Sequence, residues 1–145
     1  MTGYQDASYR LRVARGFLDE ARQDVTLARW RSAMDNAQLA VENAAKAVLA
    51  LKGPVGRTHN PAVQLRQALE AGLFAASHGD RVRQLVEHAE MLGPDIHIQT
   101  DYGDEAGRRT PWELFDEADA REALAMADAA VSLAGALIQE AGHGR

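Results

Sequence analysis

The stretch from Trp30 to Lys52 constrains the fold more than any other part of the chain. Its apolar residues recur at steps of three and four, which places them on one side of an α-helix. They are Trp30, Met34, Ala37, Val41, Ala44, Ala45, Val48 and Leu51. Alanine is the best intrinsic helix former. Gly53 and Pro54 end the helix, since glycine suits the left-handed position after the last turn. We therefore expect the chain to fold around one long, alanine-rich helix.

The same spacing predicts four further helices, over residues 6–27, 61–74, 80–92 and 119–139. Their core-facing residues are Leu11, Ala14, Phe17, Leu18, Ala21, Val25, Leu65, Leu69, Leu73, Val82, Leu85, Val86, Ala89, Ala123, Leu124, Ala127, Ala130, Val131, Ala134, Leu137 and Ile138. No segment alternates as a β-strand does. The sequence therefore predicts an all-α, antiparallel up-down bundle of about five helices, forming one domain over residues 1–145 with its core at about 6–140.

Residues near the expected helix ends have capping chemistry. Asn60 and Pro61 fit the N-cap and the first helical position, and Asp80 can cap the helix that follows it. Thr110 and Glu113 stand three residues apart and form a capping box, which starts a short turn of helix before the last one.

The segment 93–110 is different because it has no helical period. Gly93 and Pro94 end the fourth helix, and most of the residues that follow are polar types found in turns. We expect a loop here, and a loop of this length in a small domain is often functional.

Charge is distributed unevenly along the chain. The formal net charge is −5, which argues against a protein that coats nucleic acid over its whole surface. Residues 110–145 hold two arginines against seven acidic residues, whereas residues 1–31 are net basic. The acidic segment fits either a solvated helix face or a docking face for another chain.

Composition narrows the location and the chemistry. The chain has no cysteine, which removes disulfides, thiolate metal sites and cysteine nucleophiles and favours a reducing compartment. No long apolar run or secretory signal is visible, so we expect a cytoplasmic protein without a membrane span. Only Glu140 and His143 have the spacing of a helical metal-ligand pair, and no phosphate-binding loop is present. We therefore expect no metal and no cofactor.

Arginine and histidine form the one constellation with catalytic potential, at Arg81, Arg83 and His88. In metal-independent RNA cleavage a histidine can move a proton while a guanidinium offsets charge on the phosphorane. On a helix, Arg81 and His88 point about 20° apart, and Arg83 and His88 about 140°. Arg81 is thus the better partner within one chain, and either arginine could serve where two chains meet. The alternative is a surface helix whose arginines neutralise Glu87 and Glu90.

A second polar row, four residues apart, consists of Gln38, Glu42 and Lys46. Glu42 before Lys46 is the favourable order for a helical ion pair. The three side chains are either an exposed row or inward groups that fix the register of packed helices.

The sequence from Gln38 to Leu49, QLAVENAAKAVL, resembles the second-helix signature of HEPN domains, the small helical "higher eukaryotes and prokaryotes nucleotide-binding" domains. Later segments resemble the same family in order and spacing. They are Arg57-Thr58-His59, the loop from Asp101 to Asp104, Pro111-Trp112-Glu113, and Asp119 to Leu124. The resemblance covers roughly residues 6–140.

This resemblance implies a five-helix bundle that commonly dimerises. Many members carry an Arg-x(4–6)-His motif and are metal-independent endoribonucleases, often toxins paired with a nucleotidyltransferase antitoxin. Arg81 and Arg83 both match that spacing to His88. Gln84 departs from the pattern, because active members favour a small polar or acidic residue after the arginine.

We therefore expect a homodimer that binds RNA or a nucleotide, with ribonuclease activity at Arg81, Arg83 and His88. The candidate phosphate- or ligand-binding residues are Arg57, His59, Tyr102, Arg108 and Arg109. The alternative is a non-catalytic helical module that binds a partner such as a nucleotidyltransferase. A third possibility, a small-ligand pocket lined by Trp30, Trp112 and Tyr102, competes with core packing of these aromatic side chains.

Overall fold

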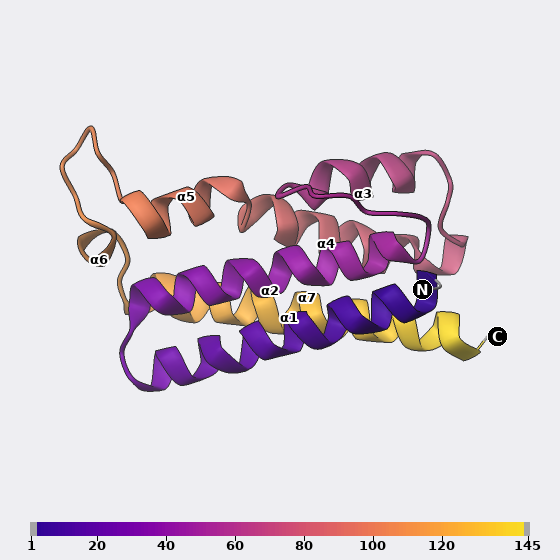
Figure 1. Cartoon of the computed structure of the whole chain (residues 1–145), viewed down its shortest axis with the longest axis horizontal. Helices are drawn as coiled ribbons and strands as arrows, with labels where there is room; N and C mark the ends of the chain where they lie inside the picture. The colour runs from indigo at the N-terminus through magenta and orange to yellow at the C-terminus, as the bar shows by residue number, and fades with distance from the viewer. Residues whose placement is uncertain (1–2, 144–145) are drawn as a thin grey trace.

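The computed structural model describes residues 3–143, which are almost entirely helical (Figure 1). In chain order the helices are α1 (Gly3–Thr26), α2 (Trp30–Ala50), α3 (Pro61–Glu70), the short 3-10 helix η1 (Ala76–His78), α4 (Gly79–Met91), α5 (Pro94–Tyr102), α6 (Pro111–Leu114) and α7 (Glu117–His143). Within residues 3–143 there is no β-strand, only an isolated antiparallel bridge between Asp104 and Arg109. The predicted all-α fold is confirmed.

Three long helices, α1, α2 and α7, pack along one another, and α3, α4 and α5 lie over α2 on its other side (Figure 1). Helix α6 and the loop before it stand at one end of the bundle, which we call the α6 end. The first turn of α1 and the last turn of α7 lie at the opposite end, which we call the terminal end. Helix α2 contacts each of the other six α-helices.

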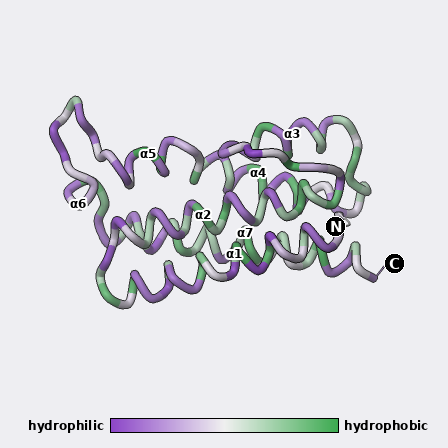
Figure 2. Tube along the Cα trace, viewed as in Figure 1, coloured by the Kyte–Doolittle hydropathy of each residue, from purple (hydrophilic) through white to green (hydrophobic). Residues whose placement is uncertain are grey.

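Alanine makes this central position of α2 possible. Thirteen of its 21 residues are buried, and more than half of these are alanine. Small side chains let several helix backbones approach one helix closely, while Val41 and Val48 fill the remaining space at zero exposure. Along the long helices, hydrophobic and hydrophilic segments alternate turn by turn, as the amphipathic spacing predicted (Figure 2).

The expectation of a loop over residues 93–110 is wrong for its first half. Residues Pro94–Tyr102 form α5, with Gly93 at the N-cap and Pro94 in the first helical position. Proline favours this position because its missing N–H would have no partner there. Helix α5 escaped detection because it has almost no apolar period, and Thr100 is its one fully buried residue.

Two details around α3 and α4 also differ from expectation. Helix α3 ends at Glu70 rather than near Phe74, because Gly72 adopts a left-handed φ of 73° and Leu73 N–H donates to the Ala68 carbonyl. Leu73 is consequently exposed instead of forming part of the core edge. Asp80 does not cap α4, because the helix already begins at Gly79. The Asp80 carboxylate instead pairs with Arg83.

The capping box before α6 is confirmed. Glu113 N–H donates to Thr110 Oγ1 at 3.3 Å, and Thr110 N–H donates to Glu113 Oε1 at 3.1 Å. The start of α7 has the same reciprocal pattern, since the amides of Asp116 and Asp119 each donate to the other's carboxylate.

Helix α7 is long and apolar enough to cross a bilayer by length and composition alone. Five of its eight buried residues are alanines, and the helix packs on α1, α2 and α4 inside the bundle. A core helix of a folded domain passes the same test, so the finding gives little support to a membrane span.

The turn between α1 and α2 depends on a buried carboxylate. Asp24, near the end of α1, accepts hydrogen bonds from Ser32 Oγ at 2.9 Å and Asn36 Nδ2 at 2.7 Å in the first turns of α2. Its carbonyl also accepts from Arg29 N–H at 2.8 Å. A negative charge beside the N-terminus of a helix is favourable, so Asp24 both satisfies donors and stabilises α2.

We expect Asp24→Ala to lower the free energy of unfolding by about 1–3 kcal/mol, since Ser32 and Asn36 lose their acceptor. Urea denaturation measures this. Asp19→Ala is the matched control, because Asp19 is an exposed partner of Arg22 and its loss should cost less than about 0.5 kcal/mol. Equal effects of the two changes would contradict this role of Asp24.

Candidate functional site

Helix α4 presents its two arginines to different neighbours. Arg83 lies on the same side of the helix as Glu90, and Glu90 pairs with Arg66 of α3. Arg81 lies on the other side and reaches Glu140 of α7. His88 shares the side of Arg81, as the spacing predicted, and stands about 10 Å further along the helix axis.

Arg81, Glu140 and His78 form the assembled cluster on this side. Arg81 Nη1 donates to Glu140 Oε1 at 2.9 Å, and Nη2 donates to Oε2 at 2.7 Å. His78, from η1, brings Nε2 to within 2.7 Å of Glu140 Oε2. A guanidinium, an imidazole and a carboxylate thus converge at the terminal end of the bundle.

The electrostatics of this cluster are consistent with a full ion pair. The hydrogen bond from Arg81 lowers the pKa of Glu140 below its usual value, and the nearby His78 contributes in the same direction. The same bond raises the pKa of Arg81. At neutral pH Glu140 is therefore an anion that pairs with the Arg81 guanidinium and also contacts the His78 imidazole.

A hollow of about 370 Å³ adjoins His78. Tyr4, Lys52, Phe74 and Leu137 are among its lining residues, and Lys52 Nζ lies 5.1 Å from the centre of the Phe74 ring. The hollow combines apolar and aromatic walls with a cationic group, as small-molecule sites in general combine apolar walls with a few polar groups.

His88 is half-buried, and its Nδ1 is enclosed without a hydrogen-bond partner among the described residues. Arg83 is exposed and bound to Asp80 at 2.7 Å. Within one chain the structure therefore brings Arg81 together with His78 rather than with His88 or Arg83. The catalytic role of Arg81, Arg83 and His88 stays a prediction.

The candidate ligand-binding residues do not gather in one place. His59 lies beside α2 and α5, with Nδ1 3.7 Å from Glu42 Oε2 and its ring stacked on His97 at a centroid distance of 6.4 Å. Arg57 is exposed on the same connection and has no ion-pair partner within residues 3–143.

Tyr102, Arg108 and Arg109 stand at the α6 end instead. Tyr102 closes α5 and is exposed. Gly103 follows with a left-handed φ of 70°, and a Cβ there would collide with the Arg109 carbonyl, so only glycine lets the loop fold back on itself. Arg109 donates to the Glu113 carbonyl at 3.1 Å, whereas Arg108 is exposed. These residues and the Arg81 cluster are at opposite ends of the bundle (Figure 1).

The row of Gln38, Glu42 and Lys46 points inward, which decides between the two alternatives that the sequence left open. Gln38 and Glu42 are only 1% and 6% exposed. Lys46 Nζ donates to Glu42 Oε2 at 3.2 Å, and Gln38 Nε2 donates to Glu42 Oε1 at 3.4 Å. These groups fix α2 against its neighbours instead of decorating a surface.

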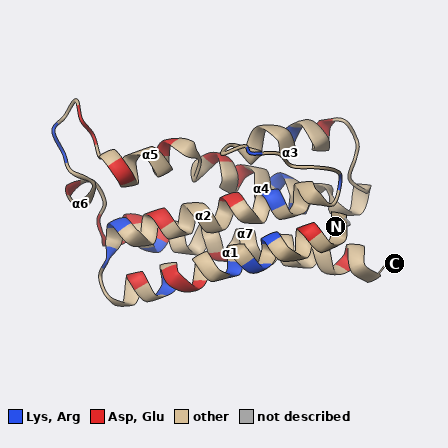
Figure 3. Ribbon diagram, in the orientation of Figure 1, with Lys and Arg blue, Asp and Glu red and all other residues tan. Residues whose placement is uncertain are grey.

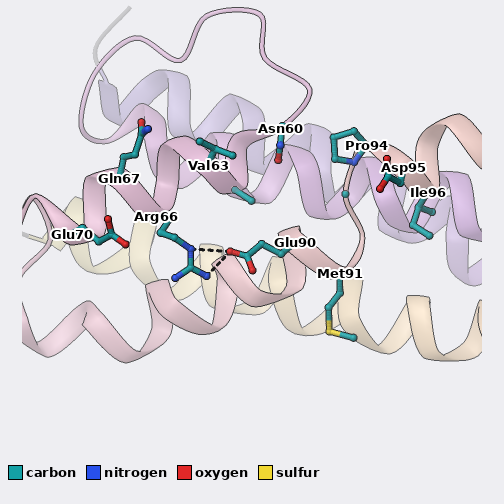
Figure 4. Close-up of a pocket in the computed structure, with 12 residues that line it drawn as sticks. Asn60, Val63, Arg66, Gln67, Glu70, Glu90, Met91, Pro94, Asp95 and Ile96 are labelled. Carbon is teal, nitrogen blue, oxygen red and sulfur yellow. Dashed lines mark hydrogen bonds and ion pairs between the residues drawn. The ribbon is translucent and has the colours of Figure 1, made fainter.

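A groove of about 870 Å³ lies between α3, α4 and the start of α5 (Figure 4). Val63 and Met91 expose apolar surface along it, and the Arg66–Glu90 ion pair joins its two helices. The alanines on the packing faces of α2 and α7 are buried within the chain. The homodimer stays a prediction, and this groove offers exposed apolar surface for it.

No three histidine, aspartate or glutamate side chains within residues 3–143 are grouped as a metal ion would require. His97 comes nearest to such a group, with Asp35 at 3.5 Å and Asp101 at 4.0 Å. Sequence reasoning singled out neither His78 nor the pairing of Glu140 with Arg81. The pairing joins residues 59 positions apart, and no local pattern signals it.

Acid should release Arg81 from Glu140. Because the pKa of Glu140 is lowered in the folded state, its stabilising contribution is complete above the usual glutamate pKa and is lost as the pH falls through the lowered value. We expect wild type to be more stable than Glu140→Gln at pH 7, with the difference shrinking between pH 5 and 3. Urea midpoints across this pH range test the expectation, with Glu20→Gln, at an exposed position of α1, as the control. A difference in stability that does not change with pH would disprove it.

Removal of the cation from the buried row should be costly. Lys46→Met leaves the buried carboxylate of Glu42 without its ammonium partner, with only Gln38 and the more distant His59 beside it, so we expect the free energy of unfolding to fall by about 3 kcal/mol. Arg121→Met breaks an exposed pair of the same spacing with Glu117 and should cost about 0.5 kcal/mol or less. Similar losses in urea denaturation would show that the burial of Glu42 carries no penalty.

Comparisons with known proteins bear on the fold. A search of curated protein sequences finds no match. Among solved structures, the crystal structure of TT1696 from Thermus thermophilus is similar, with a TM-score of 0.66 and 22% sequence identity over 90% of this chain and 97% of the other. At that identity the likeness concerns the fold alone. The family model of the HEPN domain matches residues 7–137. The chain therefore belongs to the HEPN domain family.

Proposed function

We propose that the protein is an RNA- or nucleotide-binding HEPN domain that cleaves RNA without a metal ion at the cluster of His78, Arg81 and Glu140. The observation that carries the proposal is the attachment of a guanidinium and an imidazole to one carboxylate, beside a hollow with aromatic and cationic walls. These groups can supply a base, an acid and charge stabilisation to a phosphodiester.

Glu140 acts as a positioning residue in this proposal. Its carboxylate accepts the Nε2 proton of His78, which leaves the lone pair of the neutral imidazole on Nδ1. Arg81 uses two of its five N–H donors on Glu140, so three remain for a phosphate oxygen. The carboxylate therefore orients both side chains without exhausting them.

The chemical step follows from these roles. Nδ1 of His78 takes the proton of a ribose 2′-hydroxyl, and the 2′-oxygen attacks the adjacent phosphorus. Arg81 stabilises the negative charge that develops on the phosphorane oxygens. The bond from phosphorus to the 5′-oxygen breaks, and the imidazolium returns its proton to that oxygen. The products are a 2′,3′-cyclic phosphate and a 5′-hydroxyl.

The second function considered, docking of a partner such as a nucleotidyltransferase on the acidic segment 110–145, has less support. The carboxylates of Glu113 and Asp119 accept hydrogen bonds from backbone amides at helix N-termini, and Glu117 pairs with Arg121 at 2.7 Å. Acidic residues with local partners offer a weaker field to a basic partner. Pairing with a toxin–antitoxin partner accordingly remains secondary in the proposal.

Incubation of the purified protein with single-stranded RNA in the presence of a chelator tests the activity. We expect cleavage products that end in a 2′,3′-cyclic phosphate. His78→Ala and Arg81→Ala should each slow cleavage about 100-fold or more, the usual contribution of a proton-transfer or charge-stabilising group.

Arg83→Ala is the matched control, because Arg83 lies on the opposite side of α4. His88→Ala separates the two histidines: retained cleavage supports His78 as the base, whereas loss in His88→Ala alone would move the base to the sequence-predicted residue and overturn this assignment. If the protein cleaves none of the RNAs tested, the proposed ribonuclease activity is wrong.

A further inference from the structure

We propose that a second hollow, at the α6 end, binds an unpaired nucleobase together with its phosphate. The hollow measures about 540 Å³ and lies between the α1–α2 turn and α6. Its lining residues are Ala28, Arg29, Trp30, Arg31, Ser32 and Trp112. It is remote from His78 and Arg81, so it goes beyond the proposed cleavage site and does not depend on it.

Trp112 is the platform of this site. Its side chain is 72% exposed although α6 is held firmly by a capping box and by buried Pro111. An ordered turn of helix therefore presents this large aromatic ring to solvent, beside the hollow that it lines. The Arg31 guanidinium lies 5.6 Å from the centre of the ring, so one face of the hollow already has the cation–π arrangement that flanks stacked bases.

A backbone carbonyl holds one of the two arginines of the hollow, Arg31, beside Trp112. Arg31 Nη1 donates to the carbonyl of the fully buried Thr100 at 2.8 Å, which fixes its guanidinium and leaves other donors free. Arg29 follows Ala28, whose φ of 57° lies in the left-handed region that L-residues rarely adopt. The Arg29 side chain has no ion-pair partner within residues 3–143. Strained backbone beside an unpaired cation is a feature of ligand sites.

The local charge favours an anionic ligand. None of the described residues that line the hollow is acidic. Two nearby carboxylates already have hydrogen-bond partners: Asp24 is bonded to Ser32 and Asn36, and Glu113, next to Trp112, accepts from the Thr110 amide. The loop before α6 has both acidic and basic residues (Figure 3), so the positive charge of the hollow comes from its own arginines, Arg29 and Arg31.

The size of the hollow and the acidic charge of the whole chain limit the ligand. A space of this volume holds one nucleotide, and a net charge of −5 disfavours long, nonspecific contact with a polyanion. Bases inside a duplex have no free face for Trp112. The geometry therefore selects single-stranded RNA or a mononucleotide over double-stranded RNA.

The two tryptophans of the chain both line this hollow, so intrinsic fluorescence reports on it directly. We expect a short single-stranded oligoadenylate to quench the emission with an affinity that falls as salt rises. Adenosine monophosphate should quench more weakly. The same oligonucleotide in a duplex, or inorganic phosphate alone, should leave the emission unchanged. Equal quenching by the duplex or by phosphate would overturn the proposal.

Variants locate the effect, with anisotropy of a labelled oligoadenylate as the common readout. Trp112→Ala should weaken binding about tenfold or more, Trp112→Phe should retain most of it, and Arg29→Ala should weaken it and reduce the salt dependence. Tyr9→Ala and Arg12→Ala are matched controls, because these residues form the other exposed aromatic–arginine pair at 5.7 Å on α1. Tryptophan quenching reports on this hollow and not on the hollow beside His78, which has no tryptophan among its lining residues, so the two sites are separated. Unchanged binding by Trp112→Ala would refute the proposal.

Discussion

The rest of the structure depends on the close packing of six helices around α2. This contact is possible because alanine occupies much of its buried surface, so that neighbouring backbones can approach on every side. The same crowding explains why Gln38, Glu42 and Lys46 form hydrogen bonds with one another: little water can reach their polar atoms. A carboxylate that is 6% exposed on a helix surrounded by others has little access to water and relies on Lys46 for its counter-charge.

Ion pairing decides which cations of this acidic chain are free to meet a ligand. Arg22 and Arg66 are bound to exposed carboxylates and join helices together. Arg81 is also paired, but its carboxylate is shared with His78, so that one carboxylate holds a guanidinium and an imidazole side by side. At the α6 end, Arg29 and Arg31 lie beside an exposed indole and have no carboxylate within their hollow among the described residues. The terminal end thus holds a carboxylate shared by an arginine and a histidine, whereas the α6 end holds two arginines beside an exposed indole.

Of the cluster of His78, Arg81 and Glu140, sequence reasoning predicted only Arg81 as a site residue. The spacing of Arg81, Arg83 and His88 shows which residues share a side of α4, and the structure agrees with that division. It does not show which helix covers each side. The partner of Arg81 proved to be Glu140, a residue that the sequence had offered only as half of an unsupported metal pair. Trp112 is a related case, because its neighbours gave no sign that the indole would remain exposed.

The sequence by itself determined the all-α class, the long central helix and most of the helix starts, because amphipathic spacing and capping are local properties. The helical state of residues 94–102 was decided by tertiary structure, since Thr100 and its neighbours are held against α2 without an apolar period of their own. Tertiary structure also decided the inward direction of Glu42 and the convergence of His78, Arg81 and Glu140. These features depend on which helix faces meet, and sequence spacing fixes the faces of each helix but not their partners.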